Sequence, residues 1–157
     1  MTFRETSNMD ELKAVLRDPR CYRRAQPDDA PDASTVEPVP IAGVRYIIAE
    51  EKQPLGVFLL HEKSESLADV HFTLLPPLWG KSQEVGTAFL AWVWSNTAYL
   101  KLIARVPSYN PLALRLAVAC GFEEDVITKH EGSTKHGQPY SMHWLHIYRP
   151  EEYAKCA

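Results

Sequence analysis

Three segments in the first half of the chain carry the hydrophobic pattern of β-strands. In the first segment Val44, Tyr46 and Ile48 alternate with Arg45 and Ala49, a period of two that predicts a strand. Residues 55–61 are nearly all apolar, which is typical of a central strand covered on both faces. Residues 67–75 alternate again and stop at Pro76 and Pro77, which have no N–H for a strand ladder. Together the three segments predict an antiparallel meander.

The pattern changes to helical spacing in three other places. Apolar residues three or four apart predict a helix over residues 82–96. The same spacing predicts a helix beginning at Met9, and Pro19 breaks it. Asn110 is a favourable N-cap for a third helix, and Gly121 supplies the left-handed residue that ends it.

The remaining apolar segments complete the predicted order of elements. Strands are expected at residues 2–5, 100–106, 122–129 and 140–148, with a turn-rich loop at 131–139. A helix lies between the strand at 67–75 and the strand at 100–106, so these two strands should run parallel. We therefore expect an α/β (α+β) fold with a mixed, mostly antiparallel sheet and helices on both faces.

Composition narrows the choice of function. A length of 157 residues suits one domain over residues 1–157. The net charge of −3 argues against a nucleic-acid partner, and no apolar run is long enough for a membrane span. Cys21, Cys120 and Cys156 are an odd, widely spaced set that favours a reducing cytoplasm over a disulfide framework. Residues 26–40 carry four prolines and four acids, and form either a solvated connector or a flap over an acceptor site.

Two motifs give the chain a resemblance to a known family. Residues 105–122, RVPSYNPLALRLAVACGF, place Asn110 before an apolar helix that ends in Gly121 and Phe122. Residues 72–90, FTLLPPLWGKSQEVGTAFL, read as a strand, a proline break, a turn with glycine and a helix. In this order the motifs resemble the GNAT superfamily of N-acyltransferases, over about residues 41–130. The stretches DPRCYRR, LPPLWG and VPSYNPLALRLA further resemble a phage and prophage branch of that superfamily.

The resemblance implies that acetyl-coenzyme A is the co-substrate and that its diphosphate lies where the second motif enters its helix. The N–H groups of a first helical turn have no partners within the helix, and the helix dipole favours an anion there. The family motif is Gln or Arg, two residues, Gly, one residue, then Gly or Ala. In one register Lys81, Glu84 and Gly86 take these positions, so a carboxylate replaces the middle glycine; the other register centres on Gly80, Lys81 and Ser82. The implied coenzyme-binding residues are Leu74, Leu75, Trp79, Gly80, Lys81, Ser82, Gln83, Glu84, Val85, Gly86, Thr87, Asn110 and Ala113.

Acyl transfer to an amine needs a base and a donor for the carbonyl oxygen. His71 lies on the strand that leads to the acetyl site and titrates in the useful range, although a structural histidine would show the same pattern. Asp69 and Glu62 are alternative bases. The backbone N–H of Leu74 or Leu75 is the candidate donor.

The leaving thiolate also takes up a proton. Many family members carry a tyrosine for this role seven residues after the asparagine, where this chain has Ala117. Tyr109 and Ser108 are nearby substitutes, or serve in capping and packing. We expect no metal site, because His143 and His146 are three residues apart on a strand and face opposite sides.

The sequence thus predicts an N-acetyltransferase that acts on a primary amine of a small molecule or protein. Two alternatives stay open: a GNAT-fold binding or assembly protein without catalysis, and a toxin-like acetyltransferase that modifies a host macromolecule. The resemblance is compatible with a homodimer. The acceptor is not identified by any motif.

Overall fold

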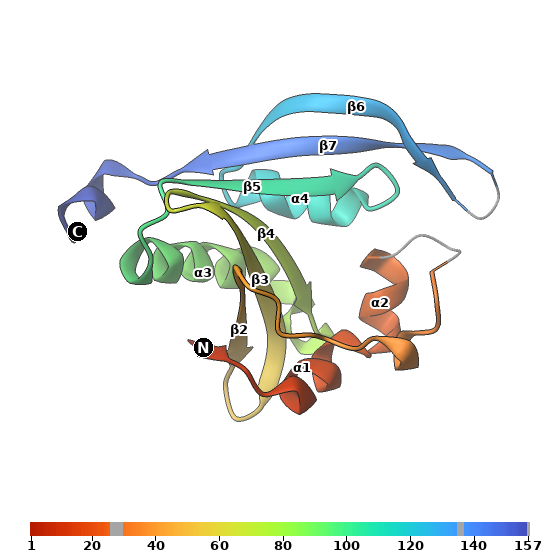
Figure 1. The fold of residues 1–157 in the computed structure, drawn as a ribbon, viewed down its shortest axis with the longest axis horizontal. Helices are drawn as coiled ribbons and strands as arrows, with labels where there is room; N and C mark the ends of the chain where they lie inside the picture. The colour runs from red at the N-terminus through yellow and green to blue at the C-terminus, as the bar shows by residue number, and fades with distance from the viewer. Residues whose placement is uncertain (26–29, 135–136, 157) are drawn as a thin grey trace.

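The structure is a computed structural model that describes residues 1–25, 30–134 and 137–156. Residues 26–29 of the predicted acidic loop lie outside this description. Seven strands form one sheet with helices packed on it (Figure 1). The strands are β1 Thr2–Thr6, β2 Val44–Glu50, β3 Pro54–Ser64, β4 Leu67–Leu74, β5 Lys101–Pro107, β6 Glu123–Ser133 and β7 Pro139–Tyr148. The α-helices are α1 Met9–Leu16, α2 Pro19–Ala25, α3 Ser82–Asn96 and α4 Pro111–Ala119, and short 3₁₀ helices are η1 Ala33–Thr35, η2 Pro76–Lys81 and η3 Glu151–Cys156.

The sheet has the strand order β1-β2-β3-β4-β5-β7-β6. Strands β2, β3 and β4 form the predicted antiparallel meander. The predicted parallel pair is β4 with β5, and all other neighbours are antiparallel. The expected fold class, a mixed and mostly antiparallel sheet with helices on both faces, is confirmed.

Short polar side chains determine where two of the helices begin. The Asn8 side chain accepts hydrogen bonds from the backbone N–H groups of Asp10 and Glu11 at the start of α1. The Asn110 side chain accepts from the Ala113 N–H at 3.2 Å at the start of α4. These bonds satisfy N–H groups that have no partner within the helix. After α4, Gly121 has φ +96°, as expected for a residue that ends a helix in the left-handed region.

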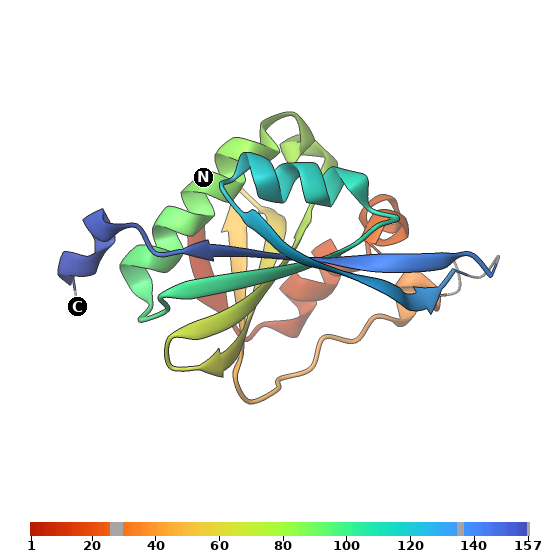
Figure 2. The same cartoon turned by 90° about the horizontal axis from the view of Figure 1, so that it is seen from above.

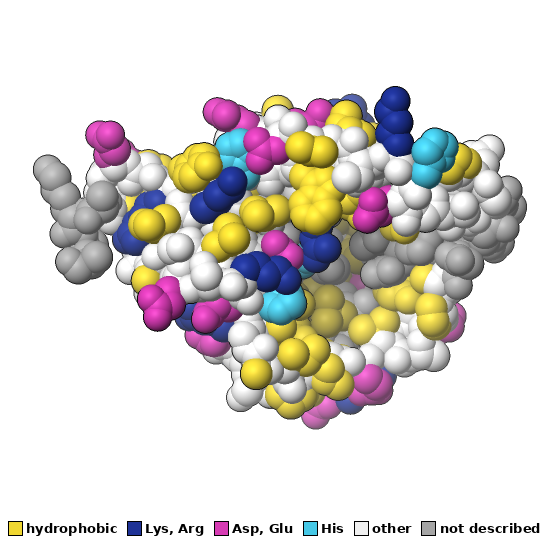
Figure 3. Space-filling model, turned by 45° about the horizontal axis from the view of Figure 1, so that its top comes forward, with side chains coloured by type: hydrophobic (Ala, Val, Ile, Leu, Met, Phe, Trp, Pro, Cys, Tyr) yellow, Lys and Arg dark blue, Asp and Glu magenta, His cyan; other side chains and the backbone are white. Residues whose placement is uncertain are grey.

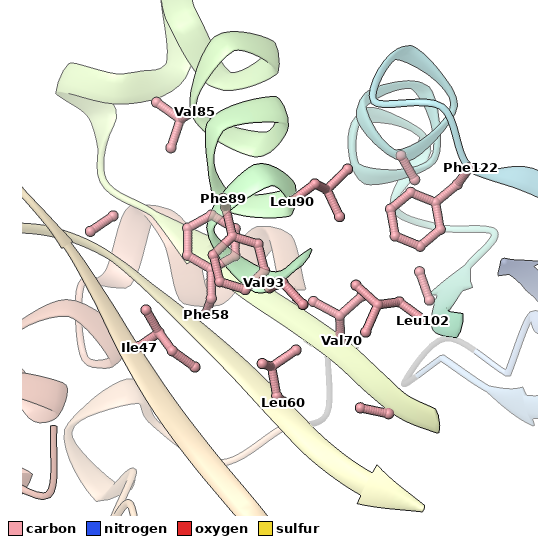
Figure 4. Packing of buried hydrophobic residues seen from close by; sticks show 14 of the residues in the cluster. Ile47, Phe58, Leu60, Val70, Val85, Phe89, Leu90, Val93, Leu102 and Phe122 are labelled. Atoms are coloured by element: carbon pink, nitrogen blue, oxygen red, sulfur yellow. The ribbon is translucent and has the colours of Figure 1, made fainter. Parts of the chain in front are cut away.

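Hydrophobic residues on the two faces of the sheet pack against different helices (Figure 2). On one face α3 and α4 cover the main cluster, in which the Phe58 and Phe89 rings stack with centroids 3.8 Å apart (Figure 4). On the other face Leu12 and Val15 of α1 are fully buried against β2 and β3. Burial of each large side chain contributes roughly 1.5–3 kcal/mol, so both helix layers are firmly held to the sheet.

The C-terminal hairpin extends further than the sequence predicts. The predicted loop at 131–139 begins too early, because β6 continues to Ser133 and pairs with Pro139 of β7. The register of the two strands shifts between Thr128 and Gly132, and a Cβ at Gly132 would approach the Tyr140 hydroxyl oxygen at 2.6 Å. A glycine that looks like a turn residue thus accommodates a tyrosine across the ladder. Within the described ranges, none of the helices combines the length and hydrophobicity that a membrane span requires.

Candidate functional site

The two central strands β4 and β5 separate part of the way along their length. Their parallel ladder consists of the pairs Leu67 with Lys101, Ala68 with Leu102 and Asp69 with Ile103. Beyond these pairs, β4 stays with β3 as far as Leu74 and β5 stays with β7 as far as Pro107. Figure 1 shows the two strands running apart. Each strand thus keeps its outer partner, and a gap opens in the middle of the sheet.

Peptide groups of β4 point into this gap. The Leu75 N–H donates to the Leu55 carbonyl at 2.8 Å, so odd-numbered residues at this end of β4 direct their hydrogen-bonding groups toward β3. Because these directions alternate along a strand, the N–H groups of Phe72 and Leu74 point the other way, into the gap. The Leu74 carbonyl faces the same side, where it accepts from the Trp79 indole N–H at 2.8 Å. The thiol of Cys21 also lies 3.2 Å from this oxygen.

This geometry separates the two predicted oxyanion donors. The N–H of Leu75 is already bonded within the sheet, so Leu75 is not a free donor and that assignment needs correction. The N–H of Leu74 keeps the orientation that the role demands. The sequence alone could not distinguish them, because the choice depends on which residues of β4 face β3.

A cleft of about 600 Å³ occupies the gap (Figure 3). Hydrophobic side chains make up most of its walls, and a few polar and charged groups gather at its mouth, as is usual for small-molecule sites. Its lining comes from both faces of the sheet and from α4. The lining residues are Leu16, Cys21, Tyr46, Val57, Leu59, Val70, His71, Phe72, Thr73, Leu74, Trp79, Ser82, Ala104, Arg105, Val106, Pro107, Asn110, Leu112, Ala113, Leu116 and Ala117.

The candidate base His71 is exposed to this cleft. Among the described residues its ring has no hydrogen-bond partner, unlike a structural histidine that is tied to its neighbours. Desolvation by the cleft walls lowers its pKa below 6.5, and the positive charge of Arg105 lowers it further. The ring remains partly hydrated, which limits the size of this shift. At neutral pH the imidazole is therefore uncharged and able to accept a proton.

The alternative bases Asp69 and Glu62 are engaged elsewhere. Asp69 is only 4 % exposed, and its carboxylate pairs with Arg105 at 3.1 Å and Lys63 at 3.3 Å. Glu62 accepts a hydrogen bond from the Tyr99 hydroxyl at 3.2 Å and does not line the cleft. His71 is thus the best placed of the three.

Fewer residues are available to bind the diphosphate than the motif suggests. Gly80 and Lys81 belong to the 3₁₀ helix η2, and the Lys81 ammonium pairs with the Glu51 carboxylate at 2.7 Å. Helix α3 follows directly at Ser82 and has no side-chain cap. The N–H groups of its first turn, together with Ser82 at the cleft wall, are what remains for an anion.

The side chains of several predicted coenzyme ligands pack within the fold. A Cβ at Gly86 would lie 2.6 Å from the Cys120 sulfur, so this glycine lets α3 approach the end of α4. The Gln83 side chain joins the same two helices by donating to the Ala119 carbonyl at 3.0 Å. Val85 is 3 % exposed and lies in the core. Glu84 and Thr87 are exposed on α3 and, like Gly80 and Lys81, do not line the cleft.

The motif at residues 105–122 does reach the cleft. Asn110 and Ala113 line it at the start of α4, and Trp79 lines it from the opposite side. Tyr109 turns toward the C-terminal hairpin, where its ring packs edge-on against Tyr140 with centroids 5.1 Å apart. Ser108 also pairs with that hairpin, through Ser141.

Sequence reasoning missed Arg105 and gave no role to Ala117. Arg105 lies on β5 and lines the cleft. In the sequence, the one feature that could have pointed to it is a charged residue within an otherwise mostly apolar strand. Ala117 is 5 % exposed and lines both the cleft and a small apolar cavity of about 40 Å³. Among the described residues, no group of three or more His, Cys, Asp or Glu side chains is placed to hold a metal ion.

Comparison with known proteins gives a consistent fold. No protein-family model and no curated protein matches the chain. Spermidine N-acetyltransferase from Vibrio cholerae, solved with coenzyme A and spermine, has TM-score 0.72 and 16% identity over 98% of both chains. A chimera of that enzyme with hSSAT has TM-score 0.73 and 18% identity over 99% of this chain and 100% of the other. A Streptococcus mutans protein has TM-score 0.71 and 13% identity over 96% and 100%. The chain therefore has the fold of the GNAT acetyltransferases.

Proposed function

We propose that the chain transfers an acetyl group from acetyl-coenzyme A to a primary amine in the gap between β4 and β5. The observation that carries this proposal is that the N–H groups of Phe72 and Leu74 on β4 face an open cleft rather than a neighbouring strand. Buried backbone groups normally find partners. An extended ligand with amide groups of its own, such as the pantetheine arm of the coenzyme, would supply them as an added strand does.

Other residues fit the same ligand. The first turn of α3 offers N–H groups to the diphosphate, and Asn110 and Ala113 present the start of α4 to the arm. The walls are mostly apolar, which suits the arm between its amides. The coenzyme supplies an activated thioester when it is bound. One structural neighbour, the spermidine N-acetyltransferase from Vibrio cholerae, was solved with coenzyme A, which supports the same co-substrate here.

The reacting groups follow from the same geometry. His71 accepts the proton of the amine, whose nitrogen then bonds to the acyl carbon. The Leu74 N–H stabilises the negative charge that develops on the carbonyl oxygen. The carbon–sulfur bond breaks and the sulfur leaves with a proton. Because Ala117 replaces a side-chain acid at the cleft wall, we assign that proton to water.

Ligand-induced stabilisation tests the proposal. A ligand present at 100 times its dissociation constant stabilises the folded state by about 2.7 kcal/mol, which raises the melting temperature. Acetyl-coenzyme A should produce such a shift, and thiol release with a panel of amines should show turnover. Ala113→Trp fills the cleft and should abolish the shift. Val118→Trp is the matched control, because Val118 is 55 % exposed on the same helix and does not line the cleft. Absence of a shift at millimolar acetyl-coenzyme A would refute the proposal.

A binding protein without catalysis is the second candidate. Ala117 removes the family's side-chain acid, and Glu84 places a carboxylate in the first turn of α3. A phage-associated assembly role would fit such a scaffold. Binding of acetyl-coenzyme A without thiol release, over a broad panel of amines, would favour this candidate over the enzyme.

A further inference from the structure

The cleft mouth beside His71 carries a positive charge. Arg105 is the one residue with a fixed charge among the described residues that line the cleft, and none of those residues is acidic. Blue, cyan and magenta side chains gather above the hollow in Figure 3. An acceptor amine that enters there meets a positive wall before it reaches the gap.

Two contacts hold the Arg105 side chain in this position. One of its terminal nitrogens, Nη2, pairs with Asp69 at 3.1 Å, and its guanidinium lies over the Trp144 ring at 5.5 Å from the centroid. Asp69 also pairs with Lys63 at 3.3 Å, so two cations share one carboxylate. The cluster therefore keeps one net positive charge, and the side chain of Arg105 is 37 % exposed.

The guanidinium has hydrogen-bonding capacity to spare. It carries five N–H donors in a planar fork, and its ion pair with Asp69 is made through Nη2. Its Nε is buried and has no hydrogen-bond partner among the described residues. Carboxylate and phosphate groups, which can accept two parallel hydrogen bonds, are the ligands that match an arginine fork.

We propose that the acceptor is a small primary amine that also bears a carboxylate or phosphate close to the amine, and that Arg105 binds this anionic group. The inference rests on the proposed function and names its acceptor class. A polyamine would bring only positive charge to a wall that already holds Arg105, and its binding would be opposed. The same positive charge lowers the pKa of an amine bound beside it, which favours the neutral, nucleophilic form.

Matched acceptors test this inference. Thiol release with acetyl-coenzyme A is measured for α-amino acids against their α-amides, for phosphoethanolamine against ethanolamine, and for spermidine. The first pair reports a carboxylate and the second a phosphate. A charge-assisted hydrogen bond contributes about 1.5–3 kcal/mol, so kcat/KM should be about 10- to 150-fold higher for the anionic member of the better pair. A preference for spermidine or for the neutral members would overturn the inference.

Two variants assign the preference to Arg105. Arg105→Gln should reduce it to within about twofold, mostly through KM. Lys63→Gln removes a cation from the same cluster but not from the cleft wall, and should leave the preference intact. If Arg105→Gln folds poorly because Asp69 is left buried, Asp69→Asn with Arg105→Gln removes both charges. Equal losses in the Arg105 and Lys63 variants would contradict a direct contact.

A binding arm separates this inference from the proposed function. Titration calorimetry of the same amines in the presence of coenzyme A reports acceptor affinity without turnover. If coenzyme A binds and the anionic amines bind more tightly than the neutral ones, but no thiol is released, the acceptor class stands and the catalytic proposal fails. If all amines bind alike or none binds, the acceptor class fails even where coenzyme A binds.

Discussion

The effect of Gly86→Ala on the free energy of unfolding should depend on the residue at position 120, which faces Gly86 across the two helices. The new Cβ would lie 2.6 Å from the Cys120 sulfur, closer than real contacts allow. Overpacking of this kind costs about 1–3 kcal/mol, whereas alanine in place of a mid-helix glycine gains about 1 kcal/mol. Gly86→Ala should therefore be neutral or destabilising by up to about 2 kcal/mol. In a Cys120→Ala background the nearest side-chain atom is the Cβ of residue 120 at 4.0 Å, and the same change should stabilise by about 1 kcal/mol.

Urea unfolding of the four proteins in this cycle measures the coupling directly. We expect a coupling free energy of about 1–3 kcal/mol between the two sites, with unchanged slopes of free energy against urea. Equal effects of Gly86→Ala in both backgrounds would refute the packing role. The double variant should also keep the thermal shift with acetyl-coenzyme A, because Gly86 does not line the cleft. A folded double variant that no longer binds would show that Gly86 contacts the ligand.

Three further changes probe the site. His71→Gln should lower kcat/KM, and the wild-type pH profile should fall on the acid side with an apparent pKa below 6.5, since the neutral ring is the base and its pKa is lowered; a pH profile unchanged by the variant would exclude His71. Trp79→Phe removes the hydrogen bond to the Leu74 carbonyl, and should cost about 1 kcal/mol on urea unfolding and weaken acetyl-coenzyme A binding severalfold; unaltered affinity would free Trp79 from that role. Asn110→Ala removes the cap on the Ala113 N–H and should cost about 1 kcal/mol, which Asn110→Asp should largely restore; failure of the aspartate to do so would point to a role beyond capping.

The hydrophobic pattern predicted the elements well, because local spacing and caps agree with the final packing. The helix over residues 82–96 has the predicted bounds, and the break at Pro76 and the start at Asn110 occur where predicted. The end of β6 was missed because Gly132 mimics a turn residue while it fits against Tyr140 across the ladder. Such a contact between distant residues leaves no local signal.

The sequence predicted only part of the candidate site. Asn110 and His71, two of the residues proposed from the sequence, line the cleft. The sequence did not show in which direction each peptide group of β4 points. Leu75 was therefore proposed as an alternative oxyanion donor to Leu74, although its N–H is bonded to β3. Arg105 was overlooked because its importance comes from the ladder that ends two residues earlier, opposite Asp69, and from no motif.

Backbone amide signals give the most direct test of the central claim, that β4 offers the N–H groups of Phe72 and Leu74 to an acyl-coenzyme A arm. In the free protein the N–H groups of Thr73 and Leu75, which face β3, should exchange slowly with solvent, and those of Phe72 and Leu74 should exchange fast. Acetyl-coenzyme A should slow exchange at Phe72 and Leu74 and shift their resonances, with little change at the other two. Equal protection of all four amides without ligand, or protection by ligand that leaves Phe72 and Leu74 unaffected, would contradict the account.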